Sequence, residues 1–236
     1  MKPFKFKQFT INQDRCAMKI GTDGVLLGAW TSLENEPRTM LDIGAGTGVI
    51  SLMLAQRSTA ENIEAVEIEE DAFEQCVENF EASPWADRLF CYHASFDEFV
   101  AEMEDPCDLI VSNPPFYSEI VSSGDSSRDA ARQNLSLPFE ELLKGVARLL
   151  DDNGVFATIM PYKDEDRFLK LAAEFSLFPR RMTRVKGSSS TAVKRSLMEF
   201  GFKQTTPKID ELIIEIGRHE YTKEYIDLTK EFYLKM

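Results

Sequence analysis

The chain has 236 residues, of which 43% are hydrophobic and 28% charged, a composition typical of a soluble protein with one α/β core. No apolar run approaches the roughly 20 residues that a membrane span needs, and the first residues lack the apolar stretch of a secretory signal. We therefore expect a cytoplasmic protein. The formal net charge of −13 argues against a general nucleic-acid binder, because phosphates are bound by Lys and Arg.

Strand and helix patterns alternate through most of the chain. Strands are predicted at 39–43, 63–68, 89–93, 108–112 and 154–160, and helices at 49–57, 70–80, 96–103, 138–150 and 164–175. From residue 180 onward, strands at 182–185, 197–202 and 212–216 follow without long helices between them. This order predicts a doubly wound α/β fold with a mostly parallel sheet that finishes in an antiparallel hairpin.

The residues before the first of these strands form a short extension. Residues 4–11 alternate and predict a strand or hairpin, and Thr22 with Asp23 looks like the capped start of a helix. We expect residues 1–38 to be this lead-in and 39–236 the main domain, within one structural domain. The four cysteines and two histidines are scattered without zinc-ligand spacing, so no metal is expected. For the oligomeric state we expect a monomer.

A glycine-rich turn follows the first strand, in Asp42-Ile43-Gly44-Ala45-Gly46-Thr47-Gly48. Glycines allow tight backbone dihedrals and close approach of a ligand, and the following helix offers unpaired N–H groups to an anion. The spacing is G-x-G-x-G rather than the dinucleotide pattern G-x-G-x-x-G. With Asp42 just before it, the turn suits a zwitterionic amino-acid tail better than a pyrophosphate, although such a turn can also be purely structural.

Glu67 ends the next strand, about 20 residues beyond the glycines. An acid at this place can accept hydrogen bonds from both hydroxyls of a ribose. A solvated carboxylate at a strand end is the alternative. The combination with the glycine turn favours a nucleoside site.

The most specific motif is Asn113-Pro114-Pro115-Phe116, which ends the strand at 108–112 because proline cannot continue a ladder. An aromatic exocyclic amine is a poor nucleophile, since its lone pair is delocalised into the ring. An amide oxygen from Asn113 and the carbonyl of Pro114 could accept its two N–H groups and favour a pyramidal nitrogen. Phe116 offers a ring on which the base can stack. The alternative is a merely rigid loop, which a strand end beside a nucleoside site disfavours.

These motifs together resemble the class I methyltransferases with an Asn-Pro-Pro-aromatic site, and more narrowly the tRNA1(Val) (adenine(37)-N6)-methyltransferase family. The narrower resemblance lies in Phe6 to Phe9, in Lys19 to Trp30, in Ser136-Leu137-Pro138 and in the tail from Tyr221 to Tyr233. It implies a seven-stranded fold, S-adenosylmethionine as methyl donor and, as partner, a tRNA whose target is the adenine next to the anticodon. Many family members carry Gly-Asp after the third strand, close to the cofactor's adenine, where this chain has Ala94-Ser95-Phe96; Ser95 can still form a hydrogen bond there.

The resemblance also implies roles for particular residues. The catalytic residues would be Asn113, Pro114, Pro115 and Phe116. The cofactor would be bound by Thr22, Asp23, Asp42, Gly44, Gly46, Glu67, Ile68, Ser95, Phe96 and Asn113.

Basic residues near the N-terminus and between 180 and 195 could form one RNA-facing surface on the acidic body. Unstacking a base is cheap in a single-stranded loop, so an anticodon loop suits such a site. An ordinary solvated surface is the alternative. The candidate phosphate contacts are Lys5, Lys7, Arg128, Arg132, Arg180, Arg181, Arg184, Lys194 and Arg195.

Other substrates stay open at this stage. The same chemistry could methylate a ribosomal RNA base amine or the glutamine amide of a release factor. Release-factor enzymes usually carry a helical N-terminal domain, for which the 38 residues before the first strand are too few. A non-catalytic RNA-binding protein with a relict fold would not need to retain Asp42, Glu67 and Asn113 together.

Overall fold

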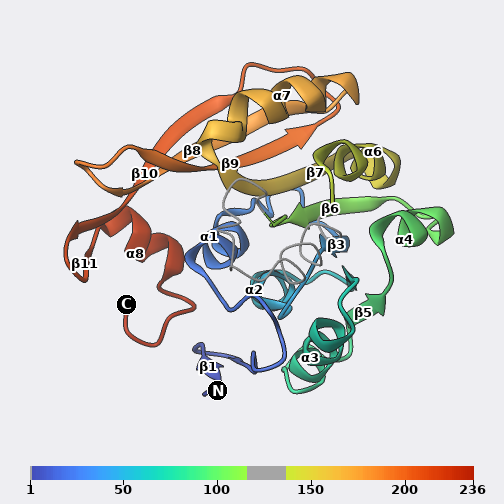
Figure 1. Ribbon diagram of the computed structural model, residues 1–236, viewed down its shortest axis with the longest axis horizontal. Coiled ribbons are helices and arrows are strands. Elements are labelled where there is room, and N and C mark those ends of the chain that lie inside the picture. The colour runs from blue at the N-terminus through green and yellow to red at the C-terminus, as the bar shows by residue number, and fades with distance from the viewer. Residues whose placement is uncertain (1, 116–136) are drawn as a thin grey trace, which may run out of the picture.

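The alternating strands and helices form one large central sheet, which Figure 1 shows in a computed structural model describing residues 2–115 and 137–236. The five strands that alternate with helices, β3 to β7, pair in parallel. β9 runs antiparallel between β7 and β8, as the predicted terminal hairpin requires. In spatial order the strands are β11 (Glu220–Tyr221), β10 (Lys208–Gly217), β8 (Phe178–Ser188), β9 (Val193–Gly201), β7 (Leu150–Pro161), β6 (Cys107–Ser112), β3 (Thr39–Ile43), β4 (Asn62–Glu67) and β5 (Leu89–His93).

Helices cover both faces of the sheet, each over its own hydrophobic cluster, which confirms the doubly wound fold. One face carries α1 (Thr22–Trp30), α2 (Val49–Arg57), α3 (Glu70–Glu81) and α8 (Lys223–Thr229). The other carries α4 (Phe96–Glu102), α6 (Phe139–Leu149) and α7 (Glu165–Glu174), the last preceded by the 3₁₀ turn η2 (Tyr162–Asp164).

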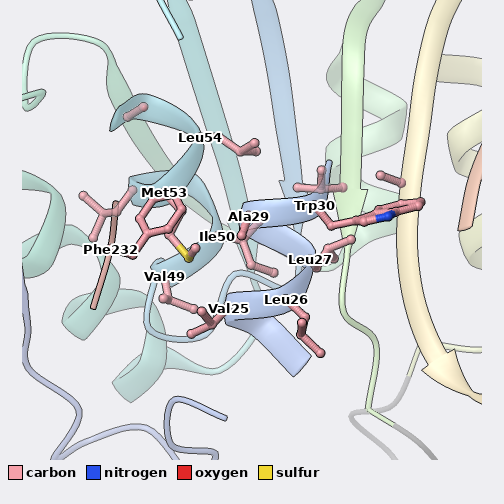
Figure 2. Packing of buried hydrophobic residues seen from close by; sticks show 14 of the residues in the cluster. Val25, Leu26, Leu27, Ala29, Trp30, Val49, Ile50, Met53, Leu54 and Phe232 are labelled. Atoms are coloured by element: carbon pink, nitrogen blue, oxygen red, sulfur yellow. The ribbon is translucent and has the colours of Figure 1, made fainter. Parts of the chain in front are cut away.

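The lead-in helix α1 packs on α2, as Figure 2 shows. Val25 and Ala29 of α1 and Met53 of α2 belong to one cluster of buried side chains. Gly28 allows this close approach, because a Cβ there would lie only 2.9 Å from the sulfur of Met53. The packing fixes the first turn of α1 beside the carboxyl ends of the strands, where the predicted site lies.

Two expectations about the elements need correction. The sheet has nine strands in the described part of the chain rather than seven, because β10 adds in parallel to β8 and β11 follows β10. The N-cap of α1 is Gly21, without a side-chain cap, so Thr22 and Asp23 are the first two helical residues.

The two ends of the described chain lie side by side (Figure 1). β1 (Phe4–Lys5) and β2 (Thr10–Ile11) form the predicted small hairpin. Phe6 makes an isolated antiparallel bridge to Tyr233, and their rings stack 5.9 Å apart. The backbone N–H of Lys7 donates to the carbonyl of Phe232 at 2.8 Å. The C-terminal tail therefore holds the N-terminal segment in place.

Candidate active site

The predicted cofactor and catalytic motifs meet at one edge of the sheet. β4, β3 and β6 are adjacent and parallel, so their carboxyl ends lie together. The hydroxyl of Ser112 donates to the carbonyl of Ile43 at 3.0 Å, which ties the end of β6 to the start of the glycine turn. The N–H of Gly44 donates to the carbonyl of Val66 at 2.9 Å, which ties the turn to β4.

The three glycines of the turn, Gly44, Gly46 and Gly48, have different structural roles. All have positive φ values, of +72° at Gly44, +55° at Gly46 and +76° at Gly48, a region that side chains rarely adopt. A Cβ on Gly44 or Gly46 would meet no atom within 4 Å, whereas one on Gly48 would lie 2.5 Å from the ring of Phe80. The first two glycines therefore leave open space at the strand ends, and the third permits packing of α2 on α3.

Asp42 is a buried carboxylate beneath this turn. Its Oδ2 accepts from the backbone N–H of Ser51 at 3.2 Å and from the Ser51 hydroxyl at 2.7 Å. Its Oδ1 is buried without a hydrogen-bond partner among the described residues. Burial raises the pKa of Asp42 from 3.8 to about 6, the bonds from Ser51 oppose that rise, and the charge of Glu67 adds to it. A buried oxygen without a partner fits a cationic ligand, because burial of an unpaired acceptor is costly.

Glu67 joins the second strand end to the turn. Its Oε2 accepts from the N–H of Gly46 at 2.7 Å, and its Oε1 accepts from the N–H of Glu69 at 3.0 Å. Each carboxylate oxygen has a further lone pair, so both can also accept a hydroxyl. The next residue, Ile68, is 42% exposed, which leaves an apolar surface beside the carboxylate. The pair suits a ribose with an adjoining flat base.

The residues after β5 have structural partners of their own. Ser95 is the N-cap of α4 and forms a capping box with Glu98, to which its hydroxyl donates at 2.6 Å. The ring of Phe96 is buried in the cluster below α6, so close to Gly145 that a Cβ there would lie 2.3 Å away. The side chain of Phe96 is thus part of the core, and its role toward a cofactor stays a prediction that only its backbone could fulfil.

Asn113 lies directly after β6 and is half-buried, while Pro114 is buried and Pro115 exposed. The helix α1 reaches this place, because a Cβ on Gly24 would lie 4.0 Å from the side-chain nitrogen of Asn113. Asn113 therefore stands between the lead-in helix and the glycine turn. Phe116, predicted to stack on a base, lies outside the described residues.

Three further side chains near the carboxyl ends of the strands were not predicted from the sequence as site residues. Ser51 holds Asp42, as described above. Asn79 of α3 is buried, and its side-chain nitrogen donates to the carbonyls of Thr47 and Asn12, both at 2.9 Å. The backbone N–H of Asn12 donates to Oδ1 of Asn79 at 2.8 Å, which places the segment before α1 close to the turn. Burial, with the charge of Glu67 adding to it, raises the pKa of Cys16 in that segment to about 11. The sequence could have identified Ser51 and Asn79 by their polar side chains inside the helices at 49–57 and 70–81. A buried polar side chain needs a hydrogen-bond partner.

Asp23, predicted to bind the cofactor, and Arg195, predicted to contact RNA, form an ion pair with each other, and both roles stay predictions. The guanidinium Nε of Arg195 lies 2.8 Å from Oδ2 of Asp23, and both side chains are about a quarter exposed or less. Arg195 stands opposite Pro161 at the end of β7. The pair links the first turn of α1, where Thr22 also lies, to the β8–β9 hairpin.

Two arginines predicted to bind phosphates belong to internal ion pairs. Arg181 makes a two-pronged contact with the buried carboxylate of Glu199, at 2.7 and 2.9 Å, and lies 3.9 Å over the ring of Trp30. Arg184 donates to the buried Glu165 at 2.7 Å. These guanidinium groups neutralise buried acids, and their contacts with RNA phosphates stay a prediction.

The other predicted RNA contacts do not gather into one surface. Lys5 and Lys7 lie with β1, at the opposite end of the molecule from β8 and β9 in Figure 1, and Lys7 donates to the carbonyl of Lys230 at 2.5 Å. Arg180 packs on Gly201 and donates to Gly154 at 3.4 Å. Lys194 is exposed. Arg128 and Arg132 lie outside the described residues.

Replacing Arg181 with alanine is expected to lower the free energy of unfolding by about 3 kcal/mol, because it leaves the buried Glu199 without its cationic partner. Urea unfolding measures this loss. The matched control is Arg38→Ala, which breaks the exposed pair between Arg38 and Glu61 and should cost under about 1 kcal/mol. If Arg181→Ala kept its stability but bound RNA more weakly, the result would show that Arg181 contacts RNA.

Among the described residues, no group of three or more His, Cys, Asp or Glu side chains could hold a metal ion. No described helix is long and apolar enough to cross a membrane.

Comparison with known proteins agrees with this geometry. The family model "Methyltransferase small domain" matches residues 22–160, from the start of α1 to the last residue but one of β7. Among solved structures, a predicted O-methyltransferase from Agrobacterium tumefaciens superposes with a TM-score of 0.68 at 18% identity, covering 89% of this chain and 96% of that one. At this identity the likeness shows the fold. The fold and the matched site thus define a methyltransferase.

Curated relatives narrow the class. The chain is 58% identical over 99% of its length to the tRNA1(Val) (adenine(37)-N6)-methyltransferase of Flavobacterium johnsoniae, all of which is covered. It is 59% identical over its full length to the enzyme of that name from Christiangramia forsetii, of which 99% is covered. The chain therefore belongs to the tRNA1(Val) (adenine(37)-N6)-methyltransferase family.

Proposed function

We propose that this enzyme transfers a methyl group from S-adenosylmethionine to the N6 amine of adenine 37 in the anticodon loop of tRNA1(Val), in the cytoplasm. The observation that carries the proposal is the position of Asn113 and Pro114, whose strand end is bonded to the glycine turn through Ser112 and Ile43 at 3.0 Å. The curated relatives with this activity in their names, at 58% and 59% identity, support the substrate.

The residues at the strand ends fit S-adenosylmethionine part by part. The unpartnered Oδ1 of Asp42 would accept a hydrogen bond from the ammonium group of its methionine end, for which Gly44 and Gly46 leave open space. Glu67 would accept the ribose hydroxyls, and the exposed Ile68 would contact the adenine. When bound, the cofactor supplies an electrophilic methyl group on a sulfonium.

The chain's own contribution is to position and polarise the amine. The side-chain oxygen of Asn113 and the carbonyl of Pro114 would each accept one N–H of the target nitrogen. The carbonyl position of Pro114 is fixed because Pro115 restricts the dihedral that precedes it. With both N–H groups held, the nitrogen lone pair can point at the methyl donor, and no general base is needed before transfer. Phe116 would stack on the flipped base.

The affinity for S-adenosylmethionine is expected to rise as the pH increases from 5 to 7. The pKa of Asp42 is about 6 in the folded protein, and an ammonium group binds the ionised carboxylate better than the neutral acid. Calorimetric titrations across this range give the dissociation constant. Asp42→Asn should bind more weakly and lose the rise, whereas an equal rise in this variant would show that another group titrates.

The same pKa predicts how stability without ligand changes with pH. The folded pKa of about 6 exceeds the ordinary 3.8, so the folded protein holds this proton more tightly than the unfolded chain. The contribution of Asp42 is therefore fully present below pH 3.8, is lost as the pH rises to about 6, and is level above that. Comparing the wild type with Asp42→Asn isolates it.

The proposed reaction is tested by methyl transfer. Labelled S-adenosylmethionine is incubated with the enzyme and total tRNA from a strain that lacks it, and the nucleosides are then analysed. We expect N6-methyladenosine, mapped to position 37 beside the anticodon of the valine tRNA. Transfer to ribosomal RNA or to a release factor, with none to tRNA, would overturn the substrate and leave the fold and the donor in place.

A further inference from the structure

An exposed aromatic side chain stands one strand away from Asn113. Tyr162 follows β7 directly and is 38% exposed. β7 runs parallel beside β6 with Thr158 opposite Ser112, so Asn113 is level with the residue after Thr158. At about 3.3 Å per residue and 4.8 Å between strands, Tyr162 lies on the order of 10 Å from Asn113 along the same edge of the sheet.

The Tyr162 ring is supported by a fixed cation. The guanidinium carbon of Arg184 lies 5.3 Å from the ring centroid, within the range of a cation–π contact. Arg184 is held by Glu165, whose carboxylate is buried and also accepts a hydrogen bond from the hydroxyl of Ser196. The ring is therefore held from one side while part of it stays exposed.

Exposed lysines lie close to Tyr162 in the chain and in the register of the sheet. Lys163 is the next residue in the chain. Lys194 precedes Arg195, which stands opposite Pro161 in the antiparallel register of β7 and β9. An exposed ring with neighbouring cations is the arrangement by which proteins bind single-stranded nucleic acid, the bases stacking on the ring and the phosphates meeting the cations. A folded protein partner would need a larger apolar surface here than one ring provides.

We propose that Tyr162 stacks on a base next to the target adenine, with Arg184 fixing the ring and Lys163 and Lys194 contacting the adjoining phosphates. The proposal rests on the proposed function, because the target adenine must be at Asn113. It replaces the phosphate contact predicted for Arg184 with a supporting role. Tyr162 would set the register of the single strand, so that the correct nucleotide enters the site.

The test compares Tyr162→Ala, Tyr162→Phe and the wild type in steady-state methylation of an unmodified anticodon stem-loop RNA. The control is Phe90→Ala, which removes a 46% exposed aromatic from β5, at the far edge of the sheet. Stacking contributes about 1–3 kcal/mol per base, so we expect Tyr162→Ala to raise the KM for RNA roughly 10-fold or more. The kcat and the affinity for S-adenosylmethionine should change little, and Tyr162→Phe and Phe90→Ala should resemble the wild type.

Two outcomes would overturn the stacking role. One is an unchanged KM in Tyr162→Ala; the other is an equal loss in Tyr162→Phe, which retains the ring. A 2-aminopurine placed beside the target position gives a second measurement, because its fluorescence should be quenched on binding the wild type and not Tyr162→Ala. If the wild type methylates no tRNA, the proposed function has failed. Binding of an unrelated single-stranded RNA would then still compare the wild type with Tyr162→Ala, because stacking on an aromatic ring tolerates any base.

Discussion

Replacing Asn113 with alanine should lower the rate of methyl transfer at least roughly 100-fold while leaving the affinity for S-adenosylmethionine within about twofold of the wild type. The side chain follows β6 and is half-buried beside α1, so the truncation removes little packing. What it removes is the acceptor for one N–H of the target amine. Without that bond the amine remains conjugated with its ring, and its lone pair is not directed at the donor.

Single-turnover methylation and calorimetric titration separate the two effects of the Asn113→Ala change. Asn113→Asp keeps an acceptor oxygen in the same place and should retain more activity than the alanine variant. Asn153→Ala is the control for a general loss of an asparagine, since Asn153 lies exposed near the start of β7. A loss of cofactor affinity as large as the loss of rate would show that Asn113 binds the cofactor or maintains the fold.

Replacing Glu67 with alanine should raise the dissociation constant for S-adenosylmethionine roughly 30-fold or more. Charged hydrogen bonds contribute about 1.5–3 kcal/mol each, and two ribose hydroxyls would lose their acceptor. The rate at saturating cofactor should stay near that of the wild type, because Glu67 is distant from the reacting amine in the proposed arrangement. The N–H groups of Gly46 and Glu69 also lose their acceptor, so thermal stability should fall.

Glu69→Ala is the matched control for Glu67→Ala. It removes a carboxylate two residues away and keeps the backbone N–H that donates to Glu67. The control should leave both cofactor affinity and stability near the wild-type values. If Glu67→Ala were less stable but bound the cofactor normally, Glu67 would only stabilise the glycine turn and would not bind the ribose.

The sequence predicts the main sheet and its order of elements because the local signals are strong there. The strand at Thr39–Ile43 and the helix at Val49–Arg57 are found at the predicted residues, and the Asn113 motif follows its strand as expected. β10 was expected as a strand, but its place beside β8 depends on pairing between residues 27 positions apart, for which a single sequence carries no local signal.

The ion pairs could not be predicted for a related reason. Arg181 and Arg184 read as surface charges in the sequence, since a strand that alternates charged and apolar residues is normally solvated on one side. Their partners, Glu199 and Glu165, lie 18 and 19 residues away on other elements and are buried. Whether Glu199 and Glu165 are buried depends on how the strands pair and on where α7 packs. Arg181 and Arg184 form their ion pairs only once that arrangement is in place.

The pairing of Phe6 with Tyr233 sets an order of events during synthesis of the chain. The segment between β2 and α1 is bonded to α3 through Asn12 and Asn79, but the hairpin just before it is held by residues that are among those translated last. A ribosome-bound chain can build β3 to β7 and still lack this contact. We therefore expect nascent chains that end before α8 to fold their sheet but to gain full affinity for the methyl donor only once the tail has emerged.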